Sequence, residues 1–150
     1  HRLSRADALM IKDSEVLAEA GTEGSELDAL RRLISDIDME EDSEFTVVEV
    51  RTVEQAIATA SIWDSKQRLR GGCERVVLLL DNMGPKKAKE ASDSLDREGL
   101  RAWCVLEGSG GVSLESLPEW GDSGVDLVSS SSLNRGVSPI DMSMKFEGGN

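Results

Sequence analysis

Four places along the chain carry residues whose types could do chemistry on a phosphorylated substrate. Lys12 follows a short apolar run, Glu49 lies in a second, Asp81 ends a third, and a Ser-Gly-Gly triplet at 109–111 follows a fourth. Carboxylates are hard oxygen ligands for Mg²⁺ and can also bind ribose hydroxyls. A Ser-Gly-Gly turn lets backbone N–H groups approach a phosphate closely. Together these residues predict a site for a metal-bound sugar phosphate, and therefore transfer chemistry.

Each of these residues also has an ordinary structural explanation. An aspartate at a strand end commonly forms a turn or caps a helix, and Ser-Gly-Gly is a common loop sequence. Glu49 and Lys12 would then be solvated strand residues. The joint pattern favours a site, because the carboxyl ends of strands in an α/β barrel all meet at one mouth.

Strand-like and helix-like segments alternate about five times along the chain. Residues 76–80 are five aliphatic residues without a polar break, which predicts a strand buried on both faces. Further strands are predicted over residues 8–12, 45–50, 101–112 and 124–130, with an edge strand over 138–146. Helices are predicted over residues 25–37, 52–63, 85–97 and 114–120, and a glycine-containing link over 13–24. This alternation predicts an α/β fold with a parallel sheet, and no linker divides residues 1–150.

The amino-acid composition restricts the kinds of molecule that the protein is expected to bind. The chain has 29 acidic and 17 basic residues and a net charge of −12, which argues against a nucleic-acid or membrane partner, since both require a basic face. This acidity suits a high-salt cytoplasm, and an ordinary acidic protein fits it equally well. No apolar run approaches the roughly 20 residues of a membrane span, and no signal peptide is visible, so we expect a cytoplasmic protein. Cys73 and Cys104 lack metal-site spacing and are expected to be small core residues.

The order of motifs resembles that of the carboxylating nicotinate-nucleotide pyrophosphorylases, also called quinolinate phosphoribosyltransferases. The resemblance begins with His1-Arg2 and, nine residues later, Lys12-Asp13. It continues with VEV at 48–50, LLDNM at 79–83, LEGSGGV at 106–112, GVDLVSSSSL at 124–133 and PIDMSMKF at 139–146. No motif is specific alone, but the set is specific and covers nearly the whole chain.

The resemblance implies an incomplete, TIM-like α/β barrel with parallel strands. Residues 1–150 would be its C-terminal barrel portion, a fragment that lacks the family's N-terminal sandwich domain. The family transfers the phosphoribosyl group of phosphoribosyl pyrophosphate to quinolinate. Loss of carbon dioxide then gives nicotinate mononucleotide, on a route to NAD. The resemblance also implies a Mg²⁺ requirement and a homo-oligomer, a dimer or larger, in which neighbouring subunits complete each site.

The family's site residues can be carried over by position. The expected catalytic residues are Lys12, Glu49 and Asp81, and the two carboxylates are the expected ligands of Mg²⁺. Cations expected to bind the quinolinate carboxylates are His1, Arg2 and Lys12. Groups expected to bind phosphate are Ser109, Gly110, Gly111, Ser131 and Arg135. Asp126 is expected to be held by backbone or neighbouring contacts, without a direct role.

The chain also departs from the family pattern at several positions. The residues that differ from the family's usual ones are Ser14, Glu15, Val47, Ser131 and Arg135. Glu15 adds an anion near an anionic substrate, so a second hypothesis is transfer to nicotinate or another nitrogen heterocycle. A third hypothesis is a non-catalytic paralogue that serves as a binding or assembly module. The 150-residue piece alone is expected to be inactive, because Arg2 and Lys12 cannot neutralise both substrates.

Overall fold

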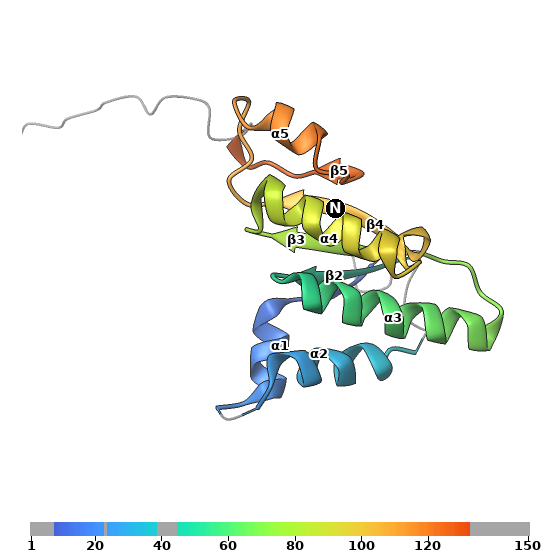
Figure 1. Cartoon of the computed structure of the whole chain (residues 1–150). Coiled ribbons are helices and arrows are strands. Elements are labelled where there is room, and N and C mark those ends of the chain that lie inside the picture. The colour runs from blue at the N-terminus through green and yellow to red at the C-terminus, as the bar shows by residue number, and fades with distance from the viewer. Residues whose placement is uncertain (1–7, 23, 39–44, 133–150) are drawn as a thin grey trace, which may run out of the picture.

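A computed structural model describes residues 8–22, 24–38 and 45–132, which form one five-stranded parallel sheet (Figure 1). The strands lie in chain order, and each pairs in parallel with the next. Their bounds are β1 (Leu9–Ile11), β2 (Thr46–Val50), β3 (Val76–Asp81), β4 (Cys104–Ser109) and β5 (Leu127–Val128). Within the described ranges the sheet stays open, because β1 and β5 do not pair with each other.

Helices cover one face of this sheet. Their bounds are α1 (Asp13–Ala20), α2 (Glu26–Ser35), α3 (Val53–Arg70), α4 (Gly84–Arg97), the 3-10 helix η1 (Arg101–Trp103) and α5 (Leu117–Gly121). Figure 1 shows α2, α3 and α4 side by side in front of the strands. This arrangement confirms the predicted α/β class, and the open sheet agrees with an incomplete barrel. None of the helices in the described ranges is long and apolar enough to span a bilayer.

The face of the sheet opposite these helices is only half-buried. In β3, Leu78 and Leu80 are fully buried, whereas Leu79 and Asp81 alternate with them and remain partly accessible. The prediction that this strand is buried on both faces is therefore wrong for the described structure. No described helix covers the second face, so only alternate side chains of the strand are shielded from solvent. Glu49 lies on this open face too, because it pairs with Leu79 in the register of β2 and β3.

Two local predictions also need correction. The expected link over residues 13–24 is helical over its first eight residues, α1, where Glu15 caps the helix by accepting a hydrogen bond from the Lys12 N–H at 2.8 Å. The strand expected to begin at Arg101 begins at Cys104, because residues 101–103 form η1. The edge strand predicted over residues 138–146 lies outside the described residues.

The two cysteines differ in environment, and both are free thiols. Cys104 begins β4 and is buried, and this burial raises the pKa of its thiol to about 12. Cys73 is exposed, which contradicts the expectation of a core residue. The reason is that α3 ends at Arg70 and β3 begins only at Val76, so Cys73 lies in the connecting loop.

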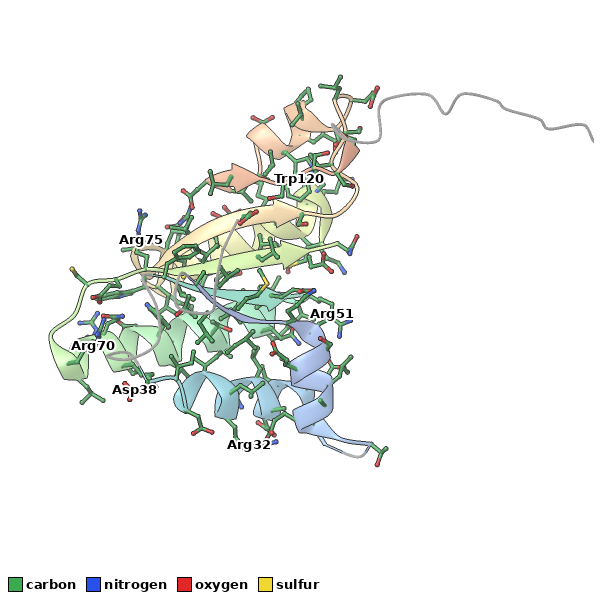
Figure 2. All side chains as sticks on the ribbon, turned by 180° about the vertical axis from the view of Figure 1, so that it is seen from behind. Arg32, Asp38, Arg51, Arg70, Arg75 and Trp120 are labelled. Atoms are coloured by element: carbon green, nitrogen blue, oxygen red, sulfur yellow. The ribbon has the colours of Figure 1, made fainter. Side chains whose placement is uncertain are left out.

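The aromatic residue of α5 packs against the backbone of β4. Trp120 is 2% exposed and lies over Gly108, where an added Cβ would be 2.3 Å from the Trp120 Cζ3 atom. Figure 2 shows Trp120 between α5 and the sheet. Only glycine at position 108 leaves room for this indole ring.

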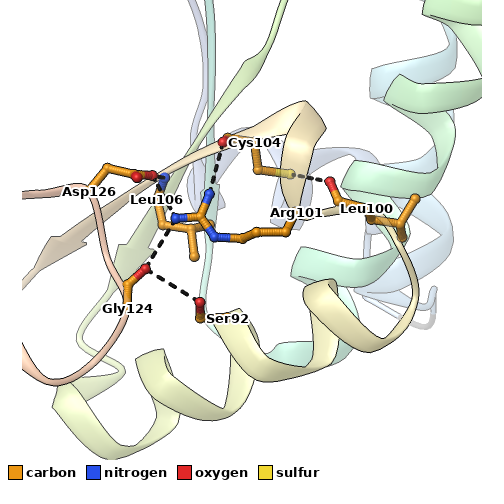
Figure 3. A network of polar contacts seen from close by, with 7 residues as sticks. All are labelled: Ser92, Leu100, Arg101, Cys104, Leu106, Gly124 and Asp126. Carbon is orange, nitrogen blue, oxygen red and sulfur yellow. Dashed lines mark hydrogen bonds and ion pairs between the residues drawn. The ribbon is translucent and has the colours of Figure 1, made fainter.

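A polar network joins β4 to the loop before β5 (Figure 3). The Asp126 Oδ2 atom accepts hydrogen bonds from the Leu106 N–H at 2.7 Å and from the Arg101 guanidinium at 2.9 Å. Arg101 also donates to the carbonyl oxygens of Cys104, at 3.0 Å, and Gly124, at 3.1 Å. These contacts agree with the expected structural role of Asp126. They lie around the start of β4, away from the strand ends that carry Asp81 and Ser109.

Lys66 of α3 binds the C-terminal end of α2. Its Nζ donates hydrogen bonds to the carbonyl oxygens of Ser35, at 2.5 Å, Ile37, at 2.7 Å, and Ile34, at 3.3 Å. The last carbonyl groups of a helix have no partner within the helix, and a cation is favourable beside them. Lys66 therefore fixes α2 against α3.

We expect Lys66→Met to lower the free energy of unfolding by about 1–2 kcal/mol, because the carbonyl groups lose their charged donor while the aliphatic stem is retained. Urea unfolding would measure this change. The matched control is Lys89→Met, which removes an exposed ammonium that pairs with Asp93 at 3.2 Å on α4. The control should change the free energy of unfolding by less than about 0.5 kcal/mol. Equal effects of the two substitutions would contradict this role of Lys66.

Candidate functional site

The carboxyl ends of β2, β3 and β4 lie together at one end of the sheet. Asp81 and Ser109 are register partners in β3 and β4, so their side chains share the open face. Glu49 lies on the neighbouring strand, in register with Leu79, which is two residues before Asp81 on the same face. The structure therefore brings together three of the residues that the sequence predicts for the site.

Lys12 reaches the same end of the sheet from β1. Ile11 is the last residue of β1 and pairs with Val48, so Lys12 follows alongside Glu49. Lys12 is exposed and directly precedes the first residue of α1. Its ammonium group lowers the pKa of Glu49. The structure thus joins Lys12 to the same group.

The electrostatic environment of Glu49 connects the members of this group. Partial burial raises the pKa of Glu49 above its ordinary value, and the nearby carboxylates of Asp13 and Asp81 raise it further. The cations of Lys12 and Arg51 act in the opposite direction. A carboxylate that interacts with two others and two cations lies in a cluster of charge, which is typical of functional sites.

Arg51 is a further member of this cluster and was not among the predicted site residues. The Arg51 guanidinium pairs with Asp13 at 3.5 Å and with Glu26 at 3.2 Å. The Arg51 backbone N–H donates a hydrogen bond to the Gln55 Oε1 atom at 2.8 Å. These contacts tie together the first turns of α1, α2 and α3. Figure 2 shows Arg51 at the end of the sheet opposite Arg70 and Arg75. Arg51 directly follows the carboxyl end of β2, and this position after a strand is the sequence signal that could have revealed it.

The Ser-Gly-Gly turn lies against the serine run that follows β5. Gly110 and Gly111 have φ of +85° and +65°, a backbone conformation that favours glycine. The Val112 carbonyl oxygen, directly after the turn, accepts hydrogen bonds from the hydroxyl groups of Ser130, at 2.6 Å, and Ser132, at 3.3 Å. Ser131 between them is exposed. The two predicted phosphate-binding segments are therefore adjacent.

Three predicted site residues, His1, Arg2 and Arg135, lie outside the described residues. Two of the departures from the family pattern have a clear structural setting. Glu15 directs its carboxylate to the Lys12 backbone N–H, so it acts as the cap of α1. Val47 is 7% exposed on the open face, in register with Met10 and Val77, so it extends an apolar strip below Glu49.

The carboxylates of this cluster fit a Mg²⁺ site that the substrate completes. Within residues 8–22, 24–38 and 45–132, no group of three or more His, Cys, Asp and Glu side chains could hold a metal by itself. Mg²⁺ is usually held by one or two carboxylates together with substrate phosphates and water. Glu49 and Asp81, close enough for one to raise the pKa of the other, supply that number.

The raised pKa of Glu49 predicts a pH-dependent stability. The folded state keeps the Glu49 proton at pH values where the unfolded state has lost it. The contribution of Glu49 to stability is therefore fully present below the ordinary value of 4.5, and it is lost as the pH rises through the folded-state pKa of Glu49. At pH 7, Glu49→Gln should raise the free energy of unfolding by up to about 1 kcal/mol, because it removes the unfavourable charge.

Urea unfolding between pH 4 and 7, with a chelator present, would measure this effect. The matched control is Glu90→Gln on the exposed surface of α4, which should change the free energy of unfolding by less than about 0.5 kcal/mol at every pH. A destabilising effect of Glu49→Gln at pH 7 would show that the charge of Glu49 is favourable in the folded protein.

Comparisons of the sequence with known proteins agree on one family. The family model described as "Quinolinate phosphoribosyl transferase, C-terminal domain" matches residues 1–145. A probable nicotinate-nucleotide pyrophosphorylase [carboxylating] of Methanothermobacter thermautotrophicus is 28% identical over 148 residues, which are 99% of this chain and 47% of that protein. A probable enzyme of the same name from Archaeoglobus fulgidus is 30% identical over 145 residues, 97% of this chain and 48% of that protein. The chain thus spans about half the length of these curated relatives.

Comparisons of the structure with solved structures agree on the fold. A NadC deletion mutant superposes with a TM-score of 0.60 at 23% identity, covering 89% of this chain and 39% of that one. The nicotinate-nucleotide pyrophosphorylase of Ehrlichia chaffeensis superposes with a TM-score of 0.51 at 24% identity, covering 85% of this chain and 38% of that one.

Proposed function

Because this chain belongs to the quinolinate phosphoribosyl transferase family, we propose that it forms the C-terminal barrel portion of an enzyme that transfers phosphoribosyl groups to quinolinate. The observation that carries the proposal is the convergence of Lys12, Glu49 and Asp81 beside the Ser-Gly-Gly turn at one end of the sheet. The products are nicotinate mononucleotide, carbon dioxide and pyrophosphate, which places the enzyme in NAD biosynthesis.

The proposed roles follow from the charges of the two substrates. Quinolinate is a dianion, so Lys12 binds one of its carboxylates, and His1 and Arg2 supply further cations. The Ser-Gly-Gly turn presents backbone N–H groups to a phosphate of phosphoribosyl pyrophosphate, with Ser131 and Arg135 as further contacts.

The proposed chemistry needs no protein nucleophile. The quinolinate nitrogen forms a bond to the anomeric carbon of ribose while the bond from that carbon to pyrophosphate breaks. Positive charge develops on the ribose in this step, and Glu49 and Asp81 stabilise it electrostatically. When bound by these carboxylates, Mg²⁺ neutralises charge on the pyrophosphate leaving group. The product then loses one carboxylate as carbon dioxide, and the ring carbon that carried it takes up a proton from water.

The proposal extends to the protein around this chain. An N-terminal sandwich domain and a neighbouring subunit supply cations that the chain lacks, so the active protein is a homo-oligomer and residues 1–150 alone are inactive. The length of the relatives supports a further domain, since the chain spans about half of each. We place the protein in the cytoplasm, where free thiols such as Cys73 and Cys104 remain reduced.

A pyrophosphate-release assay tests the proposal. The chain joined to its own N-terminal domain is expected to release pyrophosphate only when quinolinate, phosphoribosyl pyrophosphate and Mg²⁺ are all present. Residues 1–150 alone should release none. The same assay with nicotinate in place of quinolinate tests the alternative acceptor, and a higher rate with nicotinate would replace quinolinate in the proposal.

One observation favours the alternative of a non-catalytic binding module. Val47 fills an apolar strip next to Glu49, at a position where family members usually have a second glutamate. A site with fewer carboxylates can bind a sugar pyrophosphate and still fail to turn it over. Calorimetric titration that shows binding of phosphoribosyl pyrophosphate with Mg²⁺, in a protein without pyrophosphate release, would select this alternative.

A further inference from the structure

Asn82, the residue directly after Asp81, has an unusual backbone conformation. Its φ is +53°, and it is the one non-glycine residue with a positive φ within the described ranges. Asparagine tolerates this left-handed region better than most residues, but at some cost in free energy. Such conformations persist where the surrounding contacts enforce them, and they cluster at functional sites.

The contacts of Asn82 connect the ends of two strands. Its side-chain amide donates a hydrogen bond from Nδ2 to the Asp81 Oδ2 atom at 2.9 Å. Its backbone N–H donates to the Ser109 carbonyl oxygen at 3.0 Å. Asn82 therefore makes one contact to the carboxylate on β3 and one to the end of β4.

Gly110 packs directly on Asn82. A Cβ atom added at Gly110 would lie 2.3 Å from the Asn82 Oδ1 atom and 2.9 Å from the Asn82 Cα atom, so no side chain fits there. Although Asn82 is exposed, its amide group lies between the Asp81 carboxylate, which it contacts, and Gly110 of the Ser-Gly-Gly turn. The same amide group therefore contacts the Asp81 carboxylate and packs against the turn.

We propose that Asn82 is a positioning residue that fixes the Asp81 carboxylate relative to the Ser-Gly-Gly turn. This inference rests on the proposed function, in which Asp81 serves the ribose and metal while the turn binds a phosphate. Both groups then hold the same phosphoribosyl pyrophosphate molecule, so their separation must match one substrate. Catalytic groups must be held within a fraction of an ångström of the productive geometry, and supporting hydrogen bonds provide that precision.

Two substitutions separate the roles of the amide and the backbone. Asn82→Gly removes the side chain but adopts the positive φ without strain, so it should fold normally. Asn82→Asp keeps the size of the side chain and its tolerance of the left-handed conformation, but it replaces the donor to Asp81 by an acceptor. The matched control is Ala102→Gly, which adds the same backbone freedom in η1, before the opposite end of β4.

The experiment uses the chain joined to its N-terminal domain. Asn82→Gly and Asn82→Asp should each lower kcat about 10–100-fold and weaken the binding of phosphoribosyl pyrophosphate, with KM for quinolinate changed less than about 2-fold. Ala102→Gly should leave all of these values unchanged. In an Asp81→Ala background, Asn82→Gly should have a smaller effect on the Kd of phosphoribosyl pyrophosphate, because the carboxylate that it positions is gone.

Nuclear magnetic resonance without substrate tests the contact between Asn82 and the turn even if the proposed function is wrong. The ¹⁵N amide resonances of Gly110 and Gly111 should shift in Asn82→Gly and stay in place in Ala102→Gly. Unchanged glycine resonances, or an Asn82→Asp enzyme with the original kcat, would overturn the positioning role. If the unsubstituted protein bound no phosphoribosyl pyrophosphate, the proposed function would fail, and the resonances alone would then decide whether Asn82 positions the turn.

Discussion

Replacing Asp81 by alanine should lower the rate of pyrophosphate release about 10²–10³-fold, and Glu49→Ala should have an effect of the same size. The two carboxylates lie on neighbouring strands of the open face, close enough to interact electrostatically. Each substitution removes negative charge from the position where the ribose becomes positive, and it also removes a ligand for Mg²⁺. The measurement is steady-state pyrophosphate release at saturating concentrations of both substrates, in the chain joined to its N-terminal domain.

Two comparisons make this prediction specific to the site. Glu90→Ala on α4, the helix on the opposite face of the sheet, should leave the rate within about 2-fold of the original. Asp81→Ala and Glu49→Ala should also shift the Mg²⁺ concentration required for half-maximal rate upward. Full activity in either variant would remove that carboxylate from the proposed site.

Replacing Asp126 by alanine should lower the free energy of unfolding by about 2–3 kcal/mol. One oxygen of Asp126 accepts hydrogen bonds from both the Leu106 N–H and the Arg101 guanidinium. Alanine leaves a backbone donor of β4 without its partner, and it leaves a mostly buried arginine without its counter-charge. Urea unfolding monitored by circular dichroism measures the change.

Three further measurements show whether this effect comes from the network of Figure 3. Asp126→Asn keeps an acceptor for the Leu106 N–H but loses the charge, so it should cost about half as much as alanine. Asp96→Ala, at an exposed position on α4, should stay within about 0.5 kcal/mol of the original. In an Arg101→Ala background, Asp126→Ala should cost less, because the two residues share one ion pair of 2.9 Å. Strictly additive effects would show that the pair is not coupled.

The sequence was sufficient to predict the five described strands and the helices α2 to α5 in their order along the chain. Ser25 and Thr52 begin the predicted helical segments 25–37 and 52–63, and each side chain accepts a hydrogen bond from a backbone N–H three residues later. Strong hydrophobic periods and local capping are properties of neighbouring residues, so one sequence reveals them. The polar residues that follow each apolar run are visible in one sequence for the same reason.

What the sequence could not provide depends on contacts between distant segments. Helix α1 has a weak apolar pattern and was mistaken for a link, although packing against α2 stabilises it. The ion pairs of Arg51 with Asp13 and Glu26 depend on how three helices meet around β2. The contact of Asn82 with Gly110 requires the register of β3 and β4, which follows from the assembled sheet alone.

The contact between Trp120 and Gly108 has an evolutionary consequence. Because a single Cβ at Gly108 would overlap the indole ring, neither position can change alone without a penalty from overpacking. Homologues that carry a side chain at Gly108 should have a smaller residue in place of Trp120, so the two positions should covary. A designer who grafts α5 onto another barrel would have to transfer both residues as a pair.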